Sequence, residues 1–103
     1  MKNLHISVKE KVATYTSRDG IIVCDNKDYQ LVIQFDAEWE AIPNRTARFI
    51  WNQQHVDVPF TGNTVAIPPI SNTETVIVGI YTENICTTAV IIPCVLSVLC
   101  EWV

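Results

Sequence analysis

The side chains of this sequence that could do acid–base chemistry are few and widely spaced. His55 and Asp57 lie two residues apart, so on a strand they would share one face, where the carboxylate could orient the imidazole for general-base catalysis. No serine or cysteine nucleophile lies near them in the sequence, and a solvated polar face explains the pair more simply. Glu38 and Glu40 flank Trp39 and could suggest paired catalytic carboxylates, but two solvent-exposed charges at a rim are the simpler interpretation. We therefore predict no catalytic residue and no enzymatic activity.

The cysteines do not form a recognisable metal or disulfide pattern. They stand at positions 24, 86, 94 and 100, with no Cys-x-x-Cys pair, and the two histidines, His5 and His55, are far apart. Structural zinc needs clustered ligands, and a disulfide framework fits poorly with a chain that lacks an export signal. We therefore expect the cysteines to pack as small buried apolar side chains, and we expect neither a metal nor another cofactor.

The composition favours a single folded domain over residues 1–103. Hydrophobic residues make up 49% of the chain and charged residues only 17%, which argues against disorder and leaves room for exposed apolar surface. The net charge is −4 and the seven Lys and Arg residues form no basic stripe, so nucleic-acid binding is not expected.

The sequence contains no segment typical of export or membrane insertion. Its start, MKNLHISVKE, lacks the apolar region of a signal peptide, and the longest apolar runs, such as residues 89–92, are too short to span a bilayer. We therefore expect synthesis in a cytoplasm and no membrane contact.

Apolar and polar residues alternate through residues 29–60, which is the pattern of half-buried strands. Short polar connections, Pro43 and a hairpin tip at residues 52–54 separate three such runs. We therefore predict an antiparallel meander of three strands. Its inward rows are Tyr29, Leu31, Ile33 and Phe35, continued at Trp39, then Ala47, Phe49 and Trp51, then Val56, Val58 and Phe60.

Further strands are predicted on both sides of this meander. No stretch of twelve residues repeats apolar side chains at helical spacing, and Pro93 is expected to interrupt one strand. About eight to nine short strands without a helix predict an all-β fold, specifically an antiparallel immunoglobulin-like β-sandwich. The flanking strands are expected at residues 4–8, 12–17, 21–24, 64–67, 75–82, 86–92 and 95–103.

The last of these predicted strands, residues 95–103, is apolar on both faces. A sandwich strand normally shows one polar face to water, so this pattern indicates either cover by a loop within the fold or a contact with another subunit. We expect a homo-oligomer in which this strand makes the contact. The candidate interface residues are Val95, Leu96, Val98, Leu99 and Trp102.

The aromatic and cysteine spacings permit two further interpretations. Trp39, Trp51 and Trp102 could form a flat platform for a sugar ring, but the first two are in phase with inward rows, which favours core positions. Cys24, Trp39 and Cys86 mimic the spacing of an immunoglobulin domain, but Asn84 stands where that fold expects a tyrosine. We therefore expect the sandwich without its disulfide.

The run FDAEWEAIPNRTARFIW, followed by a short hairpin, VPF and TVIVGIYT, resembles small domains of bacteriophage tails and baseplates. In that family a Phe-Asp-x-x-Trp segment precedes Thr-x-x-Phe, and a later strand has the form V-x-V-G-(V/I)-(Y/F), here residues 76–81. Residues 29–82 are similar to the immunoglobulin-like N-terminal domain of baseplate upper proteins and to small head- or tail-fibre proteins of prophages. The motif marks a fold and not an active site; its residues here are Phe35, Asp36, Trp39, Thr46 and Phe49.

This resemblance implies a phage or prophage virion protein of the tail, baseplate or fibre, made in the host cytoplasm and then carried in the virion. It implies assembly with copies of itself and with other virion proteins, without chemistry of its own. Members of the family usually continue into a stalk or receptor-binding region, whereas this sequence stops at Val103, which favours a structural or adaptor subunit. The alternative is an immunoglobulin-like carbohydrate-binding module, which requires an exposed tryptophan.

Overall fold

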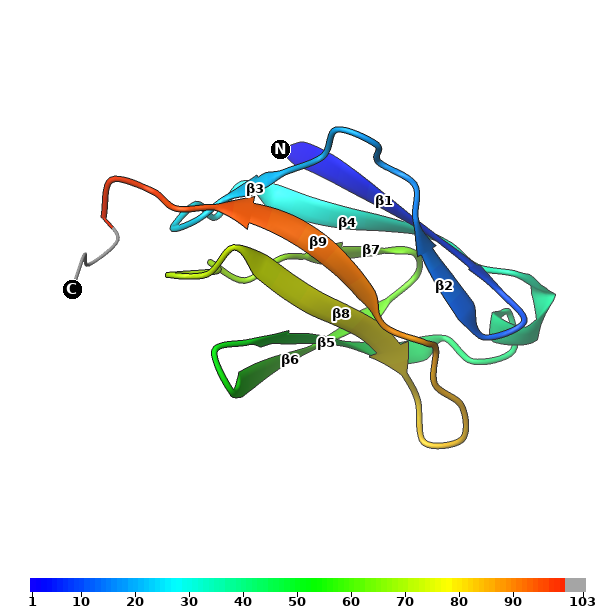
Figure 1. Ribbon diagram of the computed structural model, residues 1–103. Coiled ribbons are helices and arrows are strands. Elements are labelled where there is room, and N and C mark those ends of the chain that lie inside the picture. The colour runs from blue at the N-terminus through cyan, green and yellow to red at the C-terminus, as the bar shows by residue number, and fades with distance from the viewer. Residues whose placement is uncertain (100–103) are drawn as a thin grey trace.

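The computed structural model describes residues 1–99, which form an all-β sandwich of two facing sheets (Figure 1). One sheet has the strand order β2 (Val12–Tyr15), β1 (Lys2–Lys9), β4 (Tyr29–Gln34) and β7 (Thr64–Ala66). The other has the order β3 (Ile22–Val23), β9 (Val90–Val95), β8 (Thr75–Tyr81), β5 (Asn44–Trp51) and β6 (Gln54–Thr61). A short 3-10 helix, η1 (Ala37–Trp39), follows β4.

The core lies between the sheets and consists of the inward rows that alternation predicts. Leu31 and Ile33 of β4 and Phe49 of β5 are completely buried, as is Trp39 of η1. The inward row of β6 is only partly buried, because β6 is an edge strand of its sheet. Pro59 removes one backbone donor from β6, which hinders further strands from pairing with this edge.

The predicted meander over residues 29–60 is wrong, because β4 and β5 lie in different sheets. β4 pairs with β1 and β7, whereas β5 pairs with β6 and β8. Alternation cannot separate these arrangements, since both sheets direct their inward rows into one shared core. The β5–β6 hairpin is confirmed: Asn52 and Gln53 form its two-residue turn, with φ values of 49° and 60°.

Two strand pairs are parallel, so the prediction of a purely antiparallel sandwich is also wrong. β1 pairs parallel with β4, and β3 pairs parallel with β9. β2 folds back on β1 through Glu10 and Lys11, and β3 then joins the opposite sheet. When the chain returns to the first sheet, β4 runs in the same direction as β1 and pairs with it.

β9 continues through Pro93, where the sequence predicts an interruption. The Cys94 N–H donates to Glu74 O at 2.8 Å on the β8 side. Successive backbone amides face opposite edges of a strand, so the nitrogen of Pro93 faces away from β8, at a level where β3 supplies no paired residue. The proline therefore costs β9 no ladder hydrogen bond. β9 also begins at Val90 and not at residue 86 as predicted.

The predicted strand at residues 95–103 is wrong for residues 96–99, because β9 ends at Val95. Beyond β9 the chain leaves the sandwich at the end where β3 lies (Figure 1). The remaining part of this prediction, residues 100–103, lies outside the described residues and includes Trp102.

Phe49 gives a direct test of this core, because its ring is fully buried at the centre of β5. Phe49→Ala is expected to lower the free energy of unfolding by about 3–5 kcal/mol through lost burial and the cavity left behind. Urea unfolding measures this loss, with the exposed Val12→Ala of β2 as the control, expected within about 0.5 kcal/mol of the unmodified chain. Equal effects of the two substitutions would contradict this core.

Candidate functional site

The outer face of the five-stranded sheet carries an uncovered band of apolar side chains. Ile50, Ile77 and Ile91 are direct cross-strand neighbours on β5, β8 and β9, and they are 37%, 36% and 63% exposed. Outward residues of β9 and β3 extend this band toward the end of the sheet. We call the band the outer apolar face; it consists of Ile50, Ile77, Ile91, Pro93, Val95 and Val23.

The inward residues of the same strands are apolar as well. Val76, Val78 and Ile80 of β8 are buried in the core, and so is Ile92 of β9. β9 is therefore apolar on both faces, and β8 adds Ile77 on its outer face, although only one face of each strand meets the other sheet. A two-sided apolar pattern is typical of a strand that is covered on both sides. The sequence predicts this pattern for residues 95–103, and the structure places it on β9.

The described candidate interface residues continue from this face. Val95 belongs to it, Leu96 is partly buried, and Val98 and Leu99 are 93% and 73% exposed. The Ser97 hydroxyl donates to the Asp25 carboxylate and accepts the Leu99 N–H at 3.1 Å, which fixes the path of the segment beyond β9. Trp102 lies outside the described residues, so the structure brings together only part of the predicted interface.

Arg48 and Asp57 form an ion pair on the outer side of the sheet. Arg48 Nε donates to Asp57 Oδ1 at 2.8 Å, and its Nη2 donates to Oδ2 at 2.9 Å. The Tyr81 hydroxyl donates to the same Oδ2 at 3.0 Å, and the guanidinium lies 5.3 Å from the Tyr81 ring centre. These hydrogen bonds, mainly that from Arg48, hold the pKa of Asp57 down to about 2. Asp57 is thus engaged by Arg48 and Tyr81.

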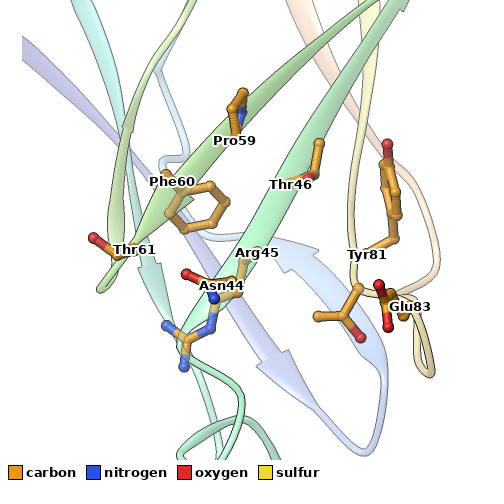
Figure 2. Close-up of a pocket in the computed structure, with 9 residues that line it drawn as sticks. Asn44, Arg45, Thr46, Pro59, Phe60, Thr61, Tyr81 and Glu83 are labelled. Carbon is orange, nitrogen blue, oxygen red and sulfur yellow. The ribbon is translucent and has the colours of Figure 1, made fainter.

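An open groove of about 610 Å³ lies where β5, β6 and the end of β8 meet (Figure 2). It holds one carboxylate, Glu83, with the hydroxyl groups of Tyr81 and three threonines, and its lining includes no histidine or cysteine. Figure 2 shows Arg45 directed away from Thr46 and Tyr81. The lining residues are Asn44, Arg45, Thr46, Pro59, Phe60, Thr61, Tyr81, Thr82 and Glu83.

Behind this groove, the predicted structural motif forms the corner through which the chain crosses between the sheets. The Phe35 and Trp39 ring centres are 5.0 Å apart, and the guanidinium of Arg45 lies 4.3 Å from the Phe35 ring centre. Asp36 Oδ2 accepts the Glu10 N–H at 2.8 Å, which ties the corner to the β1–β2 turn. The motif residues Phe35, Asp36 and Trp39 are therefore neighbours, while Thr46 and Phe49 lie along β5.

Arg45 is the residue of this corner that sequence reasoning misses. It is buried, and it donates to Trp39 O at 2.6 Å, to Ile42 O at 2.9 Å and to Gly62 O. Burial lowers the pKa of Arg45 from its usual value. The sequence does contain a sign of this burial, because Arg45 alternates in phase with the inward-facing residues of β5. Its guanidinium thus donates hydrogen bonds to three backbone carbonyls that lie in turns and have no partner in a neighbouring strand.

The cysteine prediction holds in part. Cys24 and Cys94 are buried free thiols, whereas Cys86 is exposed, and Cys100 lies outside the described residues. Burial raises the pKa of Cys94 to about 12, so this thiol is not a nucleophile at neutral pH. Cys24 Sγ lies 3.4 Å from Thr73 O, where it packs as a small core side chain.

Comparisons with protein-family models, with curated proteins and with solved structures find no match to this chain. Within residues 1–99, no three His, Cys, Asp or Glu side chains lie together in a way that could hold a metal ion. The same residues include no helix of the length and apolarity needed to cross a membrane. The site is therefore interpreted from its own geometry.

Arg45 can be tested by substitution. Arg45→Ala removes the guanidinium donors to Ile42 O and Gly62 O and one of the two donors to Trp39 O, and is expected to lower the free energy of unfolding by about 1–3 kcal/mol. Arg45→Lys should recover only part of this loss, because an ammonium cannot reproduce the planar fork. Urea unfolding gives both values, with Arg18→Ala in an exposed turn as the control. A fully stable Arg45→Lys variant would show that charge alone suffices.

The Arg48–Asp57 pair predicts a pH dependence. Because the pKa of Asp57 is about 2 in the folded chain and 3.8 is its ordinary value, the pair stabilises the fold above about pH 4, and this stabilisation is lost as the pH falls toward 2. Asp57→Asn should therefore lose less stability than the unmodified chain between pH 4 and pH 2 in urea unfolding. Asp19→Asn, in an exposed turn, is the control; identical pH profiles for Asp57→Asn and the unmodified chain would refute the assignment.

Proposed function

We propose that this chain is a non-enzymatic structural or adaptor subunit of a phage or prophage virion, in the tail, baseplate or fibre. The observation that carries the proposal is the outer apolar face, which leaves three adjacent isoleucines in water on a chain of only 103 residues. Contiguous exposed apolar surface of this kind is typical of protein contact sites. The proposed subunit therefore assembles through apolar strand surfaces after its synthesis in the host cytoplasm.

The corner residues support the phage part of this proposal. The Phe-Asp-x-x-Trp segment packs as one unit against Arg45, and the Thr-x-x-Phe segment continues on β5 from the same corner. The motif behind the resemblance thus has a structural role, the crossing between two sheets, as expected of a fold marker.

An immunoglobulin-like topology is part of the same proposal. In the variable type of that fold, strands B and E share one sheet, and C′, C, F and G share the other. β4 and β7 pair in one sheet, and β6, β5, β8 and β9 follow in that order in the other. Assigning β4, β5, β6, β7, β8 and β9 to B, C, C′, E, F and G also preserves their order along the chain, which supports this topology.

We also propose that the chain has no enzymatic activity. Asp57 is occupied by Arg48 and Tyr81, the groove of Figure 2 holds a single carboxylate, and the buried Cys94 thiol has a raised pKa. None of these arrangements pairs a nucleophile with a base.

The alternative, a carbohydrate-binding module, requires an exposed tryptophan for stacking. Trp39 and Trp51 are buried in the core, as the phase of their rows predicts. Among the described residues no tryptophan therefore offers a sugar-stacking face, and Trp102 lies outside them. No feature of the described chain favours this alternative over the virion subunit.

The virion proposal can be tested on particles. Prophages of the bacterium that encodes the chain are induced, the released particles are purified on a density gradient, and their proteins are identified by mass spectrometry. Peptides of this chain should co-purify with tail proteins at a fixed ratio across the gradient, while an abundant host cytoplasmic protein serves as the control. A chain that is present in the cells but absent from the particles would refute the proposed function.

A further inference from the structure

The outer apolar face has a relief that suits a protein contact. Beside the isoleucine row the sheet dips over Gly79, where a depression of about 140 Å³ opens next to Ile50, Ile77 and Tyr81. A Cβ built on Gly79 would meet no atom closer than Thr87 Oγ1 at 3.8 Å. Packing within the chain therefore does not require glycine at this position. The depression is an open surface feature that can receive a side chain from a partner.

The charges around the row limit what this partner can be. Arg48 and Asp57 occupy the row next to the isoleucines on β5 and β6, and they neutralise each other within one chain. Outside this ion pair, the one titratable side chain in the isoleucine row is His55, the cross-strand neighbour of Ile50. The face therefore suits a flat, apolar surface with little net charge. The outer apolar face itself has these properties, whereas Met1 and Val12, also exposed, stand apart from it at the other sheet.

We propose that the outer apolar face binds the same face of a second copy of this chain about a two-fold axis. The proposed virion subunit would assemble through this contact. The inference rests on the proposed function, which supplies the reason for the chain to assemble. If the axis runs along the strands, Ile50 lies over Ile91 of the second copy; if it runs along the row, each isoleucine lies over its own counterpart. Either axis places Ile77, the middle residue, opposite Ile77 of the second copy.

The size of the face fits one such partner. With its polar margin on β6, the outer apolar face spans the four neighbouring strands β6, β5, β8 and β9, and β8 has seven residues. Strand and residue spacings of about 4.8 and 3.4 Å then give a projected area of about 450 Å². Specific interfaces bury about 800 Å² of accessible surface per partner, and accessible surface exceeds projected area because side chains stand out from a sheet. Two such faces would pack about 10 Å apart, as the sheets of a sandwich do.

Thiol cross-linking of the full chain tests this contact. In a Cys86→Ser, Cys100→Ser background, Ile77→Cys should give a covalent dimer with a short bis-maleimide reagent, because the axis places the two thiols opposite each other. A reagent with a spacer is needed because sheets about 10 Å apart are too distant for a direct disulfide. Val12→Cys, exposed on the other sheet, is the matched control and should stay monomeric on non-reducing gels. An Ile77→Cys yield no higher than that of Val12→Cys would overturn the inference.

A second set of variants keeps the test independent of cysteine reactivity. Ile91→Asp, at the most exposed isoleucine, should raise the dimer dissociation constant at least 100-fold in sedimentation velocity while circular dichroism stays unchanged. If Val98→Asp and Leu99→Asp dissociate the dimer and Ile91→Asp does not, the segment beyond β9 makes the contact and the inference is wrong. The two proposals can fail separately. If Ile77→Cys cross-links but the chain is absent from purified particles, only the virion function is refuted. If the chain is present in particles but Ile77→Cys does not cross-link, only the face-to-face contact is refuted.

Discussion

The surface of this fold is set by one constraint: β9 is apolar on both faces, and the other sheet can cover only one of them. The inward residues of β8 and β9 complete the core, while Ile77 and Ile91 remain in water beside Ile50. Full burial of an exposed side chain of this size contributes about 1.5–3 kcal/mol. Ile50 and Ile77 are already largely covered, so covering the row gains most at Ile91 and offsets part of the entropy cost of association. The proposed assembly would cover the face that the sandwich leaves open.

The corner around Arg45 explains how a small chain keeps its two sheets aligned. The chain leaves β4, passes through η1 and enters β5 in the opposite sheet, so several carbonyls in this region lack strand partners. One guanidinium satisfies three of them and packs on the Phe35 ring. The motif residues Phe35, Asp36 and Trp39 therefore support this crossing, and the outer apolar face lies on the sheet that the chain enters at β5.

Much of the fold could be predicted from the sequence because alternation reports which residues face the core. The inward rows of β4 and β5 and the β5–β6 hairpin were predictable for that reason. Alternation contains no information about which strands pair, so the placement of β4 and β5 in different sheets and the parallel β1–β4 pair were missed. The site was predicted only in part: a strand apolar on both faces was expected at residues 95–103, whereas the structure has one at β9, residues 90–95. Pro93 was expected to interrupt that strand, and this misplaced the pattern.

The central claim, that the outer apolar face is covered by a second copy, is tested most directly by the solution mass of the unmodified chain. Static light scattering coupled to size exclusion, run from about 1 to 100 µM, should give a mass that rises to twice 11.6 kDa or a multiple of that dimer. A mass that stays at one chain over the whole range would contradict the claim, because the isoleucine row would then remain in water without a second copy.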